Sequence, residues 1–140
     1  MNADAEKNDA DLMQAFENGA LLLQLWNHRA HVRVAYLYAS QYELEDALTR
    51  MRAGLHALNA AHRVPEAVDR GYHETITVAF MRLILAACRL RPTKCSAEFC
   101  DAHPDLMTKD ILQLYYSRKR LMSLAAKKTF VEPDLAPLPD

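Results

Sequence analysis

The segment from Tyr72 to Leu90 constrains the fold most, because it is apolar on nearly every side when drawn as a helix. A helix with apolar side chains all round must be enclosed by other parts of the chain. The segment therefore predicts a central, buried helix that ends before Pro92. Arg82 and Arg89 interrupt its apolar run, so no membrane span is predicted. The apolar residues are Ile76, Val78, Ala79, Phe80, Met81, Leu83, Ile84 and Leu85.

Three helices are predicted ahead of this segment. The clearest begins near Tyr42 or Glu43, because apolar residues recur at steps of four and three along it. A second runs from His28 to about Ser40, with Asn27 as its N-cap. A short first helix covers Asp9 to Asn18 and stops at Gly19. The apolar stripe of the clearest helix is Leu44, Leu48, Met51, Leu55 and Leu58.

Two further parts of the chain are shorter or more ambiguous. Residues 20–26 either continue the first helix or form a packed connection. After Pro92 the sequence predicts short helices over 96–102, 108–116 and roughly 123–128, each capped by Ser or Thr. The tail 131–140 is proline-rich and is predicted to be extended, either draped on the core or loose.

Together these elements predict an all-α single domain over residues 1–140, with a core from about 10 to 130. Only 3 glycines among 140 residues favour helix over sheet. Four principal helices would form a bundle, and the short helices and the extended tail would follow. So apolar a chain is also compatible with a homo-oligomer.

The charge balance limits the classes of partner. With 17 basic and 18 acidic residues the net charge is -1, which disfavours a bulk polyanion binder. The basic run Arg118-Lys119-Arg120 is explained equally well by a solvated helix end, so no nucleic-acid partner is predicted. The acidic start, Met1-Asn-Ala-Asp-Ala-Glu, is unlike a targeting signal. Three cysteines are expected to be reduced thiols, which predicts a cytoplasmic protein.

Histidines provide the candidate chemistry. On the second helix Arg29, Arg33 and Ser40 mark the predicted wet side, and His31 projects almost opposite them, about 60° from His28. On the central helix Thr75, Arg82 and Arg89 mark the wet side. His73 and Glu74 lie on its apolar sides.

Topology predicts that these polar groups meet. A short turn makes the second and third helices antiparallel, and the loop over residues 62–71 returns the chain for the central helix. The second and central helices are then parallel, with their first turns at one end of the bundle. His62, at the end of the third helix, should reach the same end. The groups in those first turns are His28, His31, His73 and Glu74.

Three kinds of chemistry fit this convergence. Three His with one Glu suit zinc, whereas two His with one carboxylate suit Fe or Mn. Without a metal, His73 and Glu74 beside Tyr36 or Tyr72 would act as a general acid/base pair. Helix N-termini favour anions, so the substrate is predicted to be a small molecule with an anionic group. The candidate substrate-binding residues are Arg29, Arg63 and Arg118.

The other histidine and cysteine patterns favour structural roles. Cys95-x4-Cys100-x2-His103, with Cys88 upstream, fits no common zinc module. His56 shares a stripe with polar residues and is predicted to be on the surface. Asp101-Ala-His103 before Pro104 is more typical of local capping than of catalysis.

Three motifs resemble those of a family of small, uncharacterised bacterial all-α proteins. They are Trp26-Asn-His-Arg-Ala-His31, Gly71-Tyr-His-Glu-Thr-Ile-Thr77 and Phe130-Val-Glu-Pro-Asp-Leu-Ala-Pro137. The resemblance covers most of the chain, and the two histidine motifs carry it. It implies an all-α fold, and it implies no reaction, cofactor or catalytic role.

The sequence therefore predicts a small-molecule enzyme with a His/His/His-Glu site at one bundle end. It is expected to depend on a divalent metal (Zn, Fe or Mn) and to perform hydrolytic, lyase or oxygenase chemistry. The alternative is a non-catalytic helical module that binds a ligand or a protein. In that case the histidines form a structural hydrogen-bond network.

Overall fold

The protein is all-α, as its sequence predicts. The computed structural model describes residues 6–139. In that range it contains no β-strand, and its one isolated bridge joins Ala67 and Arg70. The acidic start over residues 1–5, which supported the absence of a targeting signal, lies outside the described residues. No helix within 6–139 is long and apolar enough to cross a membrane.

The first 90 residues of the chain supply the main helices. In chain order these are α1 (Asp9–Glu17), the 3₁₀ turn η2 (Leu23–Leu25), α2 (His28–Gln41), α3 (Leu44–Ala61) and α4 (Glu74–Leu90).

Shorter elements follow α4. They are α5 (Ser96–Ala102), η3 (Pro104–Met107), η4 (Lys109–Leu114), α6 (Arg118–Leu121) and α7 (Leu124–Lys128).

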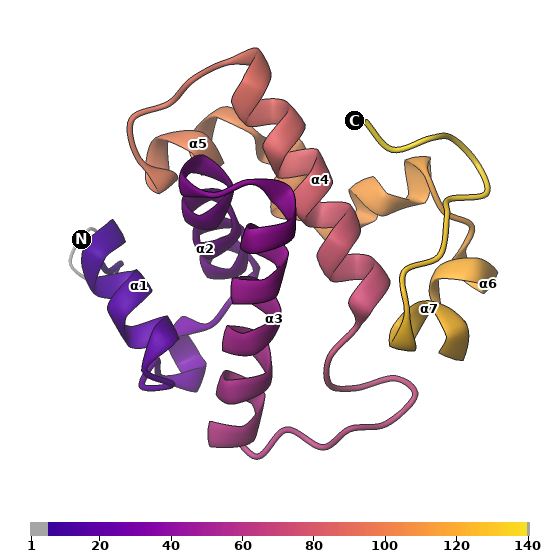
Figure 1. Cartoon of the computed structure of the whole chain (residues 1–140), viewed down its shortest axis with the longest axis horizontal. Coiled ribbons are helices and arrows are strands. Elements are labelled where there is room, and N and C mark those ends of the chain that lie inside the picture. The colour runs from indigo at the N-terminus through magenta and orange to yellow at the C-terminus, as the bar shows by residue number, and fades with distance from the viewer. Residues whose placement is uncertain (1–5, 140) are drawn as a thin grey trace.

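Helix α4 lies at the centre, and the other elements pack on both sides of it (Figure 1). The first turn of α2 meets the second turn of α4, since the ring centroids of His28 and Phe80 are 5.2 Å apart. Near their other ends, Ser40 and Cys88 border one shallow cavity. The two helices therefore run side by side in the same direction, as predicted. Helix α3 runs the opposite way, which brings its C-terminal half to the start of α4.

Helix α4 begins two residues later than the apolar pattern suggests. The Nδ1 atom of His73 accepts a hydrogen bond from the backbone N–H of Ile76 at 3.1 Å, so His73 is the N-cap. Its φ of -129° and ψ of 109° are extended, and therefore Tyr72 lies before the helix. A histidine N-cap is uncommon compared with Ser, Thr, Asp or Asn.

The short elements differ from prediction in detail. Residues 20–26 form a packed connection that contains η2, and residues 109–114 form a 3₁₀ helix where an α-helix over 108–116 was expected. The sequence analysis also missed η3 and α6. Both are a single turn long, which is too short for a periodic pattern, and α6 is held by its cap, in which Ser117 accepts from the backbone of Arg120.

Two residues assigned to the wet side are buried. Arg33 is 4% exposed and Thr75 is 0% exposed. The predicted wet side of α2 at Arg33 is covered by the segment before α1 and by α5. Thr75 is covered by the C-terminal segment, where its hydroxyl donates to Thr129 O and accepts from Val131 N. Helical periodicity alone does not reveal such later coverage.

The proline-rich tail is draped on the core rather than loose. Leu138 is 6% exposed, and the hydroxyl of Tyr116 donates to Val131 O at 2.7 Å. Arg82 donates to Pro139 O. The tail thereby returns to the side of α4, as its course in Figure 1 shows.

Candidate functional site

His73 uses both ring nitrogens to join distant parts of the backbone. Besides capping α4 through Nδ1, it donates from Nε2 to Leu121 O at 2.9 Å. These bonds require the neutral tautomer that carries its proton on Nε2. Burial lowers the pKa of His73, and the nearby ammonium groups of Lys127 and Lys109 lower it further. His73 would have to give up one of these bonds to bind a metal ion.

His28 and His31 lie next to each other on the first turn of α2. Their ring centroids are 6.4 Å apart, and the His31 ring stacks on Trp26 at 5.2 Å. His28 donates from Nε2 to Leu106 O at 2.9 Å, which leaves Nδ1 as a lone-pair acceptor. That Nδ1 atom is buried without a hydrogen-bond partner among the described residues.

Burial lowers the pKa of both histidines. The pKa of His31 falls to about 3, because burial is reinforced by the neighbouring His28 and by Lys109. For His28 the hydrogen bond to Leu106 opposes the effect of burial without cancelling it. Both rings are therefore neutral at physiological pH.

Two more histidines also donate to backbone carbonyls. His62 Nε2 lies 2.7 Å from Leu21 O, and His103 Nδ1 lies 2.8 Å from Phe99 O. With His28 and His73, four rings therefore bond to the backbone. Three of these bonds join segments that are more than forty residues apart. Each of these four rings thus uses at least one nitrogen in a hydrogen bond to the backbone.

Glu74 lies at the start of α4, but its carboxylate bonds to Arg52 and Tyr72 and not to the predicted metal-binding histidines. Arg52 of α3 donates to both of its carboxylate oxygens, with the shortest contact at 2.7 Å. The Tyr72 hydroxyl donates to Glu74 Oε1 at 2.6 Å. Burial raises the pKa of Glu74, but the bonds from Arg52 and Tyr72 outweigh it and leave the pKa below its usual value.

The predicted His/His/His-Glu set is thus only partly assembled. His31 and His73 border one cavity of about 170 Å³, which Lys109 also lines. His28 and His31 border a much smaller one. Within residues 6–139, no three His, Cys, Asp or Glu side chains converge in a way that could hold a metal ion.

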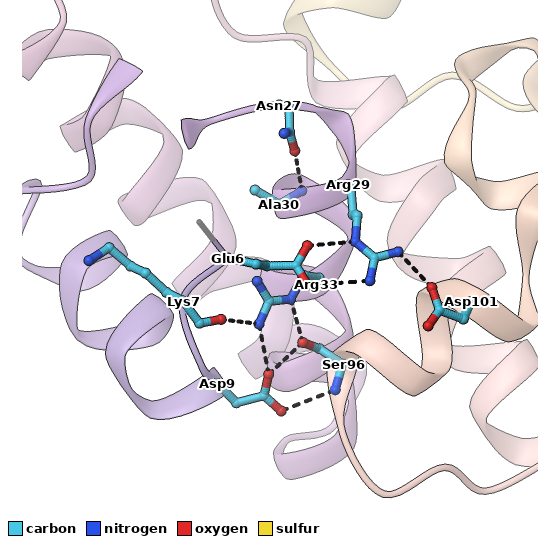
Figure 2. Close-up of polar contacts among 9 residues, drawn as sticks. All are labelled: Glu6, Lys7, Asp9, Asn27, Arg29, Ala30, Arg33, Ser96 and Asp101. Carbon is cyan, nitrogen blue, oxygen red and sulfur yellow. Dashed lines mark hydrogen bonds and ion pairs between the residues drawn. The ribbon is translucent and has the colours of Figure 1, made fainter. Parts of the chain in front are cut away.

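The predicted substrate-binding arginines lie apart from these histidines. Arg29 donates to Glu6 at 2.7 Å and to Asp101 at 3.0 Å, as Figure 2 shows. Arg63 and Arg118 are both exposed. Arg63 has a φ of 56° and follows the end of α3.

The same view contains a buried arginine that the sequence analysis placed at the surface. Arg33 donates to Ser96 Oγ at 2.7 Å and to Lys7 O at 2.6 Å, and it pairs with Asp9 (Figure 2). This cluster joins the segment before α1 to α2 and α5. Its polar contacts are satisfied by the protein itself, which is typical of a structural network.

Tyr36, the second predicted catalytic tyrosine, contacts Thr93 and Phe99 and lies away from Glu74. Its hydroxyl donates to Thr93 O and accepts from the Thr93 hydroxyl, beyond the far end of α4. Its ring stacks on Phe99, with centroids 4.6 Å apart. The structure therefore brings Tyr72, but not Tyr36, to Glu74.

A larger cleft opens on the other side of Tyr72 and Glu74. We call it the Tyr72 cleft. Its volume is about 540 Å³, and it lies between α3, the 62–73 loop and α7. It is lined by Arg52, His56, Glu66, Ala67, Val68, Tyr72, Glu74, Leu124, Lys127 and Lys128.

One wall of this cleft carries aromatic rings and charged side chains of both signs. The rings of His56 and Tyr72 are 4.4 Å apart. Lys127 is 9% exposed and donates to Tyr72 O and to Glu66. Apolar side chains complete the rim, and two of them are well exposed, Val68 at 64% and Leu124 at 51%. Such a mixture of apolar walls and a few convergent polar groups is typical of small-molecule sites.

The sequence analysis missed most of this cleft. His56 is exposed, as predicted, and Arg52 on the same face of α3 is partly buried. The useful signal is that Glu74 needs a cation and that Arg52 and His56 are one turn apart on the same face. Lys127 was not identified, because nothing in the local sequence indicates that its side chain is buried.

Comparison of the chain with protein-family models, with curated proteins and with solved structures gives no match.

Proposed function

We propose that this protein is a binding module for a small organic molecule, which it holds in the Tyr72 cleft. The observation that carries the proposal is the combination, in one cleft of about 540 Å³, of exposed apolar side chains with two ion pairs, Arg52 with Glu74 and Lys127 with Glu66. Such a site suits a ligand with an apolar body and a polar or anionic group. We also expect the protein to be cytoplasmic, as its sequence predicts.

The protonation of the site supports binding rather than acid/base catalysis. A general acid or base works best when its pKa lies near the operating pH. Here the pKa of Glu74 lies below its ordinary value. The pKa of Tyr72 lies above its ordinary value, because burial and the bond to Glu74 both stabilise the neutral phenol. At neutral pH Glu74 therefore stays ionised and Tyr72 stays protonated, and neither is poised to exchange a proton.

A titration with small fragments tests this function. Addition of neutral amides and carboxylic acids, followed by two-dimensional NMR, is expected to shift the amide signals of residues 66–74 and 124–128. Leu124→Asp should abolish these shifts, since it places a charge on the apolar rim, while an acidic residue remains compatible with the first turn of α7.

Leu114→Asp is the matched control, because Leu114 is 65% exposed and lies outside the cleft lining. It should bind fragments as the wild type does. If no fragment shifts the cleft signals, or if both variants lose binding equally, the cleft is not the functional site.

A second candidate function is the metal-dependent enzyme expected from the sequence. One observation favours it: the buried Nδ1 lone pair of His28 has no hydrogen-bond partner among residues 6–139 and lies beside His31. An imidazole in this state is a competent metal ligand. Lys109 disfavours a cation there, and Glu74 remains paired with Arg52.

Metal analysis separates the two functions. The enzyme requires near-stoichiometric Zn, Fe or Mn in tag-free protein that disappears in His31→Ala while the circular dichroism spectrum is retained. Metal-free protein after anaerobic reconstitution would leave the binding module as the better account.

A further inference from the structure

We propose that the carboxylate of Glu66 occupies the anion subsite of the Tyr72 cleft, and that a small carboxylic acid with an apolar body binds by displacing it. This inference deepens the proposed function and rests on it, because it names the class of ligand that the cleft selects. It concerns the chain's own residues on the 62–73 loop and on α7.

Glu66 is held by two donors, one for each carboxylate oxygen. Lys127 Nζ donates to Oε1 at 3.0 Å, and the backbone N–H of Tyr72 donates to Oε2 at 3.0 Å. These donors lower the pKa of Glu66, so the group is an anion at neutral pH. Two donors directed at the two oxygens of one planar group match a carboxylate.

The backbone next to this carboxylate is shaped to admit it. Gly71 has a φ of +87°, and a Cβ atom placed there would come within 2.2 Å of Glu66 Oε2. Any other residue would therefore clash with the carboxylate as well as strain the backbone. The chain thus forms a close-fitting cradle for an anion at this point.

The two charged partners differ in how firmly they are held. The side chain of Lys127 is 10% exposed, and its other hydrogen bond goes to Tyr72 O. The side chain of Glu66 is 59% exposed and lies in a loop. A buried ammonium group that loses its anion is costly, whereas an exposed carboxylate can be rehydrated. Glu66 is therefore the partner that an incoming anion can replace.

The surroundings of the cradle define the rest of the ligand. Val68 and Leu124 are large apolar residues that are more than half exposed at the rim of the same cleft. The ring of Tyr72 lies against His56 and forms part of its wall. A ligand that places its carboxylate on Lys127 can cover this apolar surface at the same time.

Titration of the full chain with benzoate and with benzamide tests the inference. The two probes share a ring and differ in charge. Glu66→Gln should bind benzoate about tenfold more tightly than the wild type, because a tethered carboxylate competes as if it were present at about millimolar concentration or above. Benzamide should bind both proteins equally. Affinities come from NMR titration at fixed ionic strength.

Glu98→Gln is the matched control, since it removes one negative charge from an exposed position on α5. Its benzoate affinity should stay within about twofold of the wild type, as expected for a distant surface charge. Lys127→Met should lose the preference for benzoate over benzamide, with folding checked by circular dichroism.

The outcomes separate this inference from the proposed function. Equal benzoate affinity in Glu66→Gln and wild type overturns the displacement of Glu66, and so does an equal gain for benzamide. If both probes still bind in the cleft, the proposed function survives. If neither probe shifts the signals of the cleft in any variant, both proposals fail.

Discussion

At the residue scale, the single side chain of His73 both caps a helix and donates a hydrogen bond to a distant backbone carbonyl. It caps α4 through Nδ1 and holds Leu121 O through Nε2. Both the start of the central helix and the position of α6 therefore depend on one neutral imidazole. The rings of His28 and His62 likewise fix the backbone at Leu106 and Leu21.

The first prediction concerns His73. His73→Ala should lower the free energy of unfolding by about 2–4 kcal/mol, because it removes a helix cap and leaves a buried carbonyl without a donor. His73→Asn should lose less, since its side chain can still accept from Ile76 N. Urea unfolding measures both. Equal stability of the wild type and His73→Ala would show that neither bond matters.

The second prediction concerns pH. Burial holds the folded-state pKa of His31 at about 3, below the unfolded value of 6.5. The unfolded chain then binds the proton first, so the stabilisation is fully present above pH 6.5 and is lost as the pH falls toward 3. Between pH 6.5 and 5 the loss should reach up to about 2 kcal/mol.

His31→Phe keeps a ring against Trp26 but cannot be protonated. Its stability should therefore change less between pH 6.5 and 5 than that of the wild type. Thermal or urea unfolding at constant ionic strength makes the comparison. If the two proteins have the same slope against pH, His31 is not the group that titrates.

At the element scale, α1 packs against α3 at a point where α3 has no side chain. Gly54 of α3 faces the ring of Phe16, and a Cβ atom there would come within 2.1 Å of that ring. Phe16 is 0% exposed, so the ring has no free space into which to move. A glycine in the middle of a helix usually costs stability, and here it permits a close contact between helices.

The third prediction follows from that contact. Gly54→Ala should destabilise the protein by about 1–3 kcal/mol, although alanine is the better helix former. Adding Phe16→Leu should recover part of the loss, because the smaller side chain makes room for the new methyl group. A double-mutant cycle in urea measures the coupling. An increase in stability in Gly54→Ala would contradict the close packing.

The sequence could predict elements where the periodic pattern is long, as in α2, α3 and α4. It also predicted the parallel α2 and α4 pair, because short connections allow few topologies. It could not predict single turns such as α6, or that Arg33 and Thr75 are covered. Those outcomes depend on segments that are remote in sequence and return to the same surface.

In the candidate site, too, residues close together in the sequence were predicted and their distant partners were not. Tyr72 and Glu74 were identified and do lie together, because they are neighbours in the chain. Their partners Arg52 and Lys127 are 22 and 55 residues away from Glu74 and Tyr72, respectively. With one sequence, nothing indicates which of the exposed-looking cations reaches the carboxylate.

At the scale of the whole molecule, the last segment closes the core instead of trailing from it. Leu138 is 6% exposed, whereas Leu135, three residues earlier, is 58% exposed. The backbone N–H of Leu135 bonds to Tyr115 O, and the Ser117 hydroxyl donates to Asp134. The tail, which follows α7, is therefore held by hydrogen bonds to residues that precede α7 in the sequence.

The fourth prediction uses this pair of leucines. Leu138→Ala should lower the free energy of unfolding by about 2–3 kcal/mol, in the range for a buried leucine. Leu135→Ala should change it by less than about 0.5 kcal/mol, as expected at an exposed position. Chemical unfolding of the two variants compares them directly. Similar losses in both would show that the tail contributes little to the core.

The position of Leu138 also bears on how the chain is made. Helix α4 is synthesised after α2 and α3 but before the C-terminal segment that covers the rest of it, so part of its surface leaves the ribosome without its final neighbours. The core can close only after residue 138 has emerged from the ribosome, so part of the surface of α4 stays uncovered while the residues between α4 and Leu138 are synthesised. During that interval the nascent chain exposes apolar surface of α4, and a chaperone that binds apolar segments would act at this stage.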